Sequence, residues 1–306
     1  MTTAAPLQAT PIHEISNISL KNSASTLDAT KKNVDYPIPR GPVTTQLLFY
    51  APPADGSSPY NYVEELPKGE PQRNFGDNEQ PVRLDDIRGR ENDYNLDHNA
   101  FEAISHVPSD EKDFEDDNRV KQVYYPEVEK LLLEHVPGAN RVFIFDHTIR
   151  RSGPNAHRTP VTRTHIDQTP ASAEARVHHH LPEEAESLLR GRYRLINIWR
   201  PLNGPVASFP LGFADSSTVN DEDLVGVRHI YPDRDGETAG VKYNPNQQWH
   251  YWSGMTNDER LLLKCYDSDE ALGSWGRVPH TAFVDPRTSD KAPGRESIEV
   301  RALVFG

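Results

Sequence analysis

Hydrophobic side chains in the middle of the chain recur at helical spacing. Val128, Leu131 and Leu132 lie three or four residues apart, which places them on one face of a helix that starts near Tyr125. Gly138 follows this pattern and is a residue type that commonly ends a helix. The spacing therefore predicts an amphipathic helix that packs one side against a core.

Two further helices are predicted from the residues at their ends. Thr169 followed by Pro170 is typical of a helix N-terminus, because the hydroxyl accepts a hydrogen bond from the backbone and proline suits the first turn. Pro182 begins another helix, and Gly191 ends it. The clearly predicted helices therefore lie in the middle of the chain.

The second half of the chain changes to the alternation that is typical of strands. Residues 192–199 alternate between polar and apolar side chains and predict a half-buried strand. Further strands are predicted at residues 43–50, 141–146, 225–230, 248–252, 261–267, 281–284 and 297–305. Residues 51–118 predict long loops with short helices, and their acidic run 110–117 a solvated face. The expected class is α+β, with helices outside a sandwich-like or barrel-like sheet core.

Composition restricts the partners of the protein. The 306 residues carry a net charge of −13, which repels phosphate backbones and excludes nucleic acid as an expected partner. No apolar run approaches the ~20 residues of a membrane span, and the N-terminus lacks a secretory signal, so no membrane partner is expected. A single cysteine allows no internal disulfide and fits a reducing, cytoplasmic location.

The first residues differ in composition from the remainder. Residues 1–40 are rich in Thr, Ser, Ala and Pro and show weak periodicity, which predicts a poorly ordered or wrapping N-terminal arm. Residues 41–306 are then expected to form one domain.

His165 and Asp167 form the first candidate for chemistry. In an extended segment, residues two apart point to the same side, so both side chains reach one point in space. With one more histidine they make the two-histidine, one-carboxylate set that leaves coordination positions open on a divalent metal. His280, at the start of a predicted strand, is the candidate third ligand, and His250 is the alternative. A surface histidine beside an acid at a helix N-terminus remains the structural alternative for His165.

Other residues of the chain are further candidates for ligands or for the substrate pocket. His178, His179 and His180 are consecutive on a predicted helix and point in different directions, so they are expected at the helix end without a shared ion. Four residues are predicted to line a substrate pocket, with ordinary strand packing as the alternative for His250, and Trp199 is predicted to lie in the core. The pocket set is Asn197, Arg200, His250 and Trp252.

The last predicted strand carries charged residues on one face. Arg295, Ser297, Glu299 and Arg301 share this face, whereas the other face is apolar. A buried arginine is costly unless it meets an anion, and a dicarboxylate would accept both prongs of its guanidinium. A structural salt bridge with a neighbouring glutamate is the alternative.

Six segments, taken in order, resemble the fungal AsaB-type hydroxylase/desaturase family, which is related to the CmcJ-like proteins. They are residues 147–151 (HTIRR), 164–169 (THIDQT), 196–201 (INIWRP), 266–268 (YDS), 279–283 (PHTAF) and 295–301 (RESIEVR). The resemblance covers residues 43–306 and implies a double-stranded β-helix (jelly-roll, cupin-like) core with flanking helices. It also implies a non-haem Fe(II)/2-oxoglutarate-dependent oxygenase.

By this resemblance His165, Asp167 and His280 are the iron ligands, and no catalytic residue is assigned beyond them. Arg295 with Ser297 is the favoured anchor for 2-oxoglutarate, and Arg301 is second. The implied reaction uses O2 to hydroxylate or desaturate a small molecule of secondary metabolism. A zinc-dependent hydrolase with the same ligands and a non-catalytic binding protein remain as alternatives, and the sequence leaves the oligomeric state open.

Overall fold

The computed structural model describes residues 36–63, 68–151, 159–232 and 234–306. Residues 36–306 form one compact unit. Most of the predicted N-terminal arm, residues 1–35, lies outside the described residues. Arg40, near the start of the described part, donates hydrogen bonds to the backbone carbonyl and hydroxyl of Ser253.

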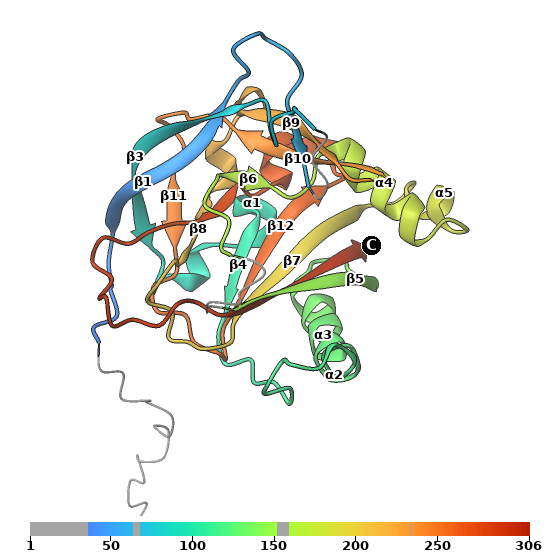
Figure 1. The fold of residues 1–306 in the computed structure, drawn as a ribbon. Helices are drawn as coiled ribbons and strands as arrows, with labels where there is room; N and C mark the ends of the chain where they lie inside the picture. Colours follow the sequence, from blue (N-terminus) through green and yellow to red (C-terminus); the bar gives the residue numbers. More distant parts are fainter. Residues whose placement is uncertain (1–35, 64–67, 152–158, 233) are drawn as a thin grey trace, which may run out of the picture. The chain divides into compact units, whose positions relative to one another are not determined.

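Two sheets contain the named strands of the described residues (Figure 1). The nine-stranded sheet has the order β1 (Val43–Ala51), β3 (Gly76–Asp86), β11 (Trp249–Tyr251), β8 (Leu211–Ala214), β13 (His280–Ala282), β6 (His165–Ile166), β10 (Asp235–Val241), β9 (Leu224–Ile230) and β2 (Tyr60–Tyr62). The five-stranded sheet has the order β4 (Phe101–Ile104), β12 (Arg260–Asp267), β7 (Tyr193–Pro201), β14 (Ser297–Phe305) and β5 (Arg141–Arg150). Most neighbouring strands are therefore far apart in the chain, whereas β9 and β10 are consecutive.

Helices are fewer than strands among the described residues. The α-helices are α1 (Leu96–Asn99), α2 (Asp117–Arg119), α3 (Tyr125–His135), α4 (Pro170–His180) and α5 (Ala185–Leu188). Short segments of other helix types are η1 (Glu91–Asp93), η2 (Val120–Tyr124), η3 (Ser216–Thr218), η4 (Asp221–Asp223) and η5 (Glu270–Gly276). The expected mixture of helices with a mostly β core is confirmed at this level. None of the helices in the described part has the length and apolar character that a membrane crossing needs.

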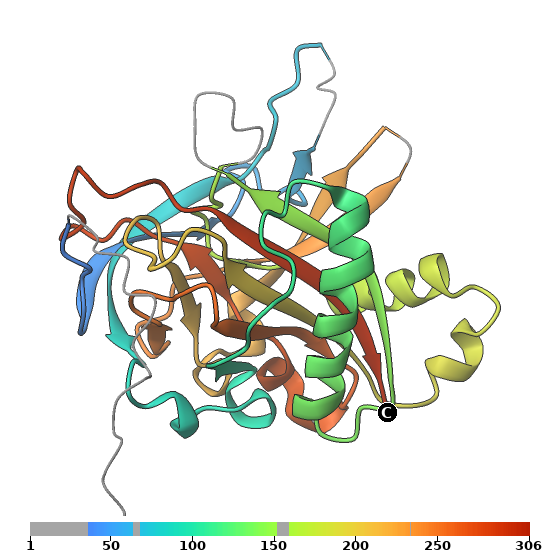
Figure 2. The same cartoon turned by 90° about the horizontal axis from the view of Figure 1, so that it is seen from below.

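Helix α3 covers one face of the five-stranded sheet, and Figure 2 shows it lying along that sheet. Its predicted face, which includes Val128, Leu131 and Leu132, packs in one cluster with Ile298 and Val300 of β14. The predicted alternation along β14 is therefore confirmed, because its apolar residues face α3. The opposite face of this strand is left for the charged residues.

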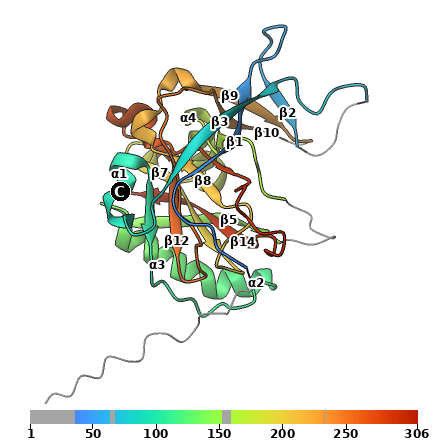
Figure 3. The same cartoon turned by 90° about the vertical axis from the view of Figure 1, so that its left-hand side faces the viewer.

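Helix α4 starts as its sequence predicts. The Thr169 hydroxyl accepts a hydrogen bond from the backbone N–H of Ser172, while the Ser172 hydroxyl bonds the Thr169 backbone, which completes a capping box. Ala173 and Val177 of α4 are buried in a cluster with Leu195 and other residues of the five-stranded sheet. Figure 3 shows α4 beside β9 and β10, where it borders the cavities described below.

Several strand predictions differ from the structure. Strand β7 is buried along its whole length and not half-buried, because β12 and β14 flank it and α3 covers one face. Strand β3 lies within residues 51–118, where loops were expected, since its sequence GDNEQPVRLDD has few apolar positions. Strands β8 and β10 were also not predicted. Strand β5 continues past the predicted end at residue 146 to Arg150.

We expect Leu132→Ala to lower the free energy of unfolding by about 2–5 kcal/mol, because it removes a fully buried side chain between α3 and the sheet. The adjacent Leu133 is 40% exposed, so Leu133→Ala should change the unfolding free energy by less than about 0.5 kcal/mol. Urea denaturation of both variants measures the difference. Equal losses in the two variants would contradict the assigned face of α3.

Candidate metal centre

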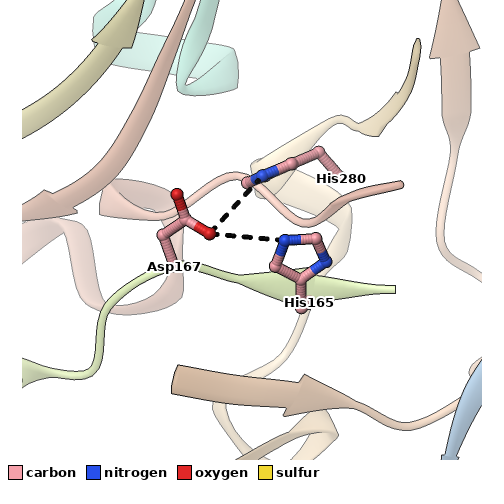
Figure 4. A group of neighbouring side chains, drawn as sticks. All are labelled: His165, Asp167 and His280. Atoms are coloured by element: carbon pink, nitrogen blue, oxygen red, sulfur yellow. Dashed lines mark ion pairs between the residues drawn. The ribbon is translucent and has the colours of Figure 1, made fainter. Parts of the chain in front are cut away.

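His165, Asp167 and His280 converge from two neighbouring strands, as Figure 4 shows. One nitrogen or oxygen atom from each residue lies within 4.8 Å of the others. The Nε2 atom of His165 is 3.3 Å from Oδ1 of Asp167, and Nε2 of His280 is 4.0 Å from the same oxygen. In the described part of the chain, no other group of His, Cys, Asp or Glu side chains has this spacing.

The pairing of β6 with β13 brings the two histidines together. His280 and His165 are directly opposite each other in this antiparallel pair, and their ring centres are 4.5 Å apart. Asp167 follows β6 by one residue and returns to the side of His165, as the spacing predicts. The backbone therefore determines the distance between all three side chains.

Hydrogen bonds determine which nitrogen of each histidine is available. Nδ1 of His165 lies 2.8 Å from the carbonyl oxygen of Arg163, and Nδ1 of His280 lies 3.1 Å from that of Val278. Because a carbonyl oxygen only accepts, both Nδ1 atoms carry the proton. Each Nε2 atom is then the basic nitrogen, which is the form that ligates a metal.

The carboxylate of Asp167 is also held in position. Its Oδ2 accepts a hydrogen bond of 2.7 Å from the side-chain amide of Asn197, and its Oδ1 faces the histidines. Burial by itself raises the pKa of Asp167, but its contact with His165 and the positive charge of Arg301 lower it well below its usual value. Burial lowers the pKa of His280 to about 4. At neutral pH the set therefore holds an ionised acid and a neutral His280 imidazole.

This donor set fits a divalent metal of intermediate hardness. Two imidazole nitrogens and one carboxylate oxygen from one side leave the remaining coordination positions open. The three side chains line a cavity of about 380 Å³. The arrangement is therefore suited to a catalytic metal and not to a closed structural one.

The two arginines considered as anion anchors both line this cavity but differ in their partners. Arg301 is bonded through Nε and Nη2 to the carboxylate of Asp146, with a further bond to the Thr148 hydroxyl. These contacts raise the pKa of Arg301 overall, although burial opposes the change. The carboxylate of Asp146 therefore already accepts hydrogen bonds from two nitrogens of the Arg301 guanidinium.

Arg295 lies in a different environment. It is 5% exposed, donates to the carbonyl oxygen of Phe209 and lies 5.2 Å from the ring centre of Trp199. Burial lowers the pKa of Arg295 to about 9, and the nearby charge of Arg150 adds to this effect. Ser297 is buried on β14 and lies directly opposite Arg150 in the antiparallel pairing of β14 with β5. Arg150 and Arg295 thus supply two positive charges to one cavity.

Three residues assigned to the substrate pocket lie elsewhere, which corrects their assignment. Arg200 lies over the ring of Phe114 at 4.6 Å, because residues three apart on a strand face opposite sides and Asn197 faces the metal centre. His250 packs against the rings of Tyr94 and Phe101, at 5.1 and 5.9 Å, and is not near the other ligands.

Trp252 and the histidine triplet are also away from the three converging residues. The indole N–H of Trp252 donates to Glu91 at 2.9 Å. His178 and His179 are exposed at the end of α4, whereas His180 stacks on Phe145 at 5.0 Å. None of the three belongs to a metal-binding group in the described ranges.

The sequence did not predict that several residues line this cavity. Trp199 belongs to a core cluster, as predicted, and also lines the cavity. Glu299 lines it too, and burial together with the charge of Asp167 raises the pKa of Glu299. The alternation on β14 placed Glu299 on this face but assigned it no role. Arg150 and His229 required knowledge of how far β5 extends and where β9 lies.

Comparisons with known proteins point to one group of enzymes. Residues 47–305 match the family model YDMC, described as an oxidoreductase/YMDC permease-like domain. The hydroxylase/desaturase poxK of Penicillium oxalicum is 36% identical over 301 residues, which cover 88% of this chain and 93% of that protein. The Fe(II)/2-oxoglutarate-dependent dioxygenase nvfI of Aspergillus novofumigatus is 33% identical over 271 residues, which cover 86% and 96%. A solved structure of the iron and alpha-ketoglutarate-dependent endoperoxidase NvfI has a TM-score of 0.79 and 31% identity, and covers 88% of this chain and 99% of that one.

We expect Asn197→Ala to lower the affinity of the His165–Asp167–His280 group for Mn(II) by about 10- to 100-fold, because the carboxylate loses the hydrogen bond that orients it. Asn99→Ala is the matched control, since Asn99 makes the same kind of bond to Asp215, at 2.9 Å. Calorimetric titration with Mn(II) measures both affinities. An unchanged affinity in Asn197→Ala would show that this bond does not support metal binding.

Proposed function

The chain belongs to the hydroxylase/desaturase family of Fe(II)/2-oxoglutarate-dependent oxygenases, and on this premise we propose that His165, Asp167 and His280 hold its iron. An enzyme of this family uses Fe(II), 2-oxoglutarate and O2 and acts on small molecules. The observation that supports the ligand assignment is the convergence of three donor atoms within 4.8 Å. The fixed Nδ1 protons of both histidines support it further.

The cavity residues prepare the site for this chemistry. Bound iron, with 2-oxoglutarate and O2 as co-substrates, supplies the oxidation of a substrate C–H bond, and 2-oxoglutarate leaves as succinate and CO2. Asn197 keeps the Asp167 carboxylate in one orientation, and the carbonyls of Arg163 and Val278 orient the imidazoles. The Trp199 indole forms an apolar part of the wall that limits the access of water.

Arg295 is the proposed anchor for the distal carboxylate of 2-oxoglutarate. It is nearly fully buried, lines the metal cavity and lies near Arg150, so an anion there would meet two positive charges. Arg301 is the weaker candidate because Asp146 and Thr148 already accept its hydrogen bonds. Ser297, which is buried two residues further along the chain, is proposed as a neighbouring part of the anchor.

The finer fold class and the reaction type belong to the same proposal. The solved structures that resemble this chain are of iron-dependent oxygenases, which supports a double-stranded β-helix core for the two sheets. Relatives named hydroxylase/desaturase support hydroxylation or desaturation of a metabolite. No similar protein favours a zinc hydrolase or a non-catalytic protein among those compared. Cytoplasmic location and the absence of nucleic-acid or membrane partners remain predictions from composition.

We expect the purified protein to form succinate from 2-oxoglutarate when Fe(II) and O2 are supplied. His165→Ala and Asp167→Ala should each lower this rate at least about 100-fold, because each removes a proposed iron ligand. His178→Ala is the matched control, since this exposed histidine lies outside the metal group and should retain the rate. Succinate is measured by chromatography.

Two outcomes would count against the proposal. Turnover that persists in both ligand variants would end the assignment of His165 and Asp167. The absence of succinate when the wild-type protein is supplied with Fe(II), 2-oxoglutarate and O2 would contradict the oxygenase proposal itself.

The two arginines are separated by their effect on the KM for 2-oxoglutarate. Arg295→Gln should raise this KM at least about tenfold, because one charge-assisted contact to a carboxylate is lost. Arg301→Gln should raise it less, since Arg301 is engaged with Asp146. The measurement is succinate formation over a range of 2-oxoglutarate concentrations. A larger effect in Arg301→Gln would exchange the two assignments.

A further inference from the structure

A second cavity adjoins the metal cavity on the side of α4. Its volume is about 540 Å³, and it lies between one face of α4 and the strands β9 and β10 with the turn that joins them. We call it the outer chamber. The residues that line both cavities form their boundary: Asp167, Gln168, Arg176, His229, Tyr231 and Thr238. A molecule in the outer chamber would therefore reach the metal centre past Asp167.

The walls of the outer chamber are polar, and two of its acids, Asp235 and Glu237, already accept hydrogen bonds from the protein. Arg228 forms an ion pair of 2.6 Å with Asp235 across the β9–β10 hairpin. Glu237 accepts a hydrogen bond from the hydroxyl of Thr169. Its acids are therefore occupied by groups of the protein itself.

Arg176 differs from these charged groups. Within the described ranges, no residue accepts a hydrogen bond from its guanidinium or forms an ion pair with it, and the guanidinium carbon lies 5.2 Å from the ring centre of Phe145. The side chain is half-buried, and burial lowers the pKa of Arg176. The negative charge of Asp146 raises this pKa in part, but Asp146 forms an ion pair with Arg301. A partly desolvated guanidinium thus lines both cavities without an acid of its own.

Such a group binds a planar oxyanion best. Guanidinium presents its N–H donors in a fixed fork that matches a carboxylate, and the contact strengthens when water is partly excluded. Arg176 lies at the boundary of the two cavities. A ligand whose carboxylate binds Arg176 would therefore have the rest of its atoms in the outer chamber or next to the metal centre. The volume of the chamber is in the range of sites for metabolites of drug-like size.

We propose that the substrate of this enzyme carries a carboxylate that Arg176 binds, while its body occupies the outer chamber between α4 and the β9–β10 hairpin. This inference rests on the proposed oxygenase function and names the substrate class of the same site. Arg176 acts as a specificity-determining residue, and 2-oxoglutarate remains bound on the other side of the boundary.

The test uses two probes of nearly equal shape, 1-naphthoate and 1-naphthamide, which differ in charge. Each is titrated by its fluorescence into the full chain loaded with Mn(II), which stands in for Fe(II) without supporting turnover, and saturated with 2-oxoglutarate. The wild-type protein should bind the acid about tenfold more tightly than the amide, the difference expected for a charge-assisted contact. Arg176→Gln should abolish this preference.

Two comparisons make the result specific to Arg176. The amide should bind Arg176→Gln within about twofold of its wild-type affinity, which shows that the chamber is still folded. Arg190→Gln removes the same charge from an exposed position that lines neither cavity, and the preference for the acid should persist. A loss of preference in both variants would reflect net charge alone and would overturn the proposal.

Other outcomes also overturn it. A wild-type protein without a preference for the acid, including one that binds neither probe, lacks the proposed site. Displacement of 1-naphthoate by rising 2-oxoglutarate would place the acid at the Arg150 and Arg295 end of the inner cavity instead. Succinate formation, measured on the same wild-type preparation, is independent of these titrations, so failure of the oxygenase proposal is recognised separately.

Discussion

The pairing of β6 with β13 is the contact on which the metal centre depends. It sets His165 opposite His280, and residues directly opposite in an antiparallel pair have their side chains close together. Strand β6 has only two residues, so its neighbours must hold it in place. Thr164 bonds the carbonyl oxygen of Leu48 through its backbone and its hydroxyl, and β10 pairs on the other side at Ile166. The site is therefore positioned by strands that contribute no ligand.

Strands β7 and β14 connect the core with the cavity. Each presents one face to α3 and the other to the metal centre, so Ile198 and Val300 lie in the helix-covered cluster while Asn197 and Glu299 point inward. A shift of one residue in their pairing would exchange these faces and bury the charges under α3. The requirement for an apolar face against α3 thus also specifies which polar side chains reach the cavity.

The sequence predicted the features that depend on local spacing. The cap of α4 at Thr169, the alternation of β14 and the shared side of His165 and Asp167 all follow from a few adjacent residues. Features set by distant partners were missed or wrong. Strand β3 is polar and is defined by pairing with β1, and Arg200 was misplaced because its face depends on what covers β7. The choice of His280 over His250 required the resemblance, since both lie on short strands.

Charge balance explains why acids and arginines occur together between the sheets. A divalent ion on Asp167 and two neutral imidazoles leaves one positive charge, and a dicarboxylate co-substrate brings two negative ones. The remaining negative charge requires a cation at the inner end, which Arg295 supplies beside Arg150. Burial and the charge of Asp167 raise the pKa of Glu299, which favours its neutral form and keeps it from competing with the co-substrate for these cations. The inner cavity therefore has its own cations for the co-substrate, and Arg176 at the boundary is a separate cation for a second anion.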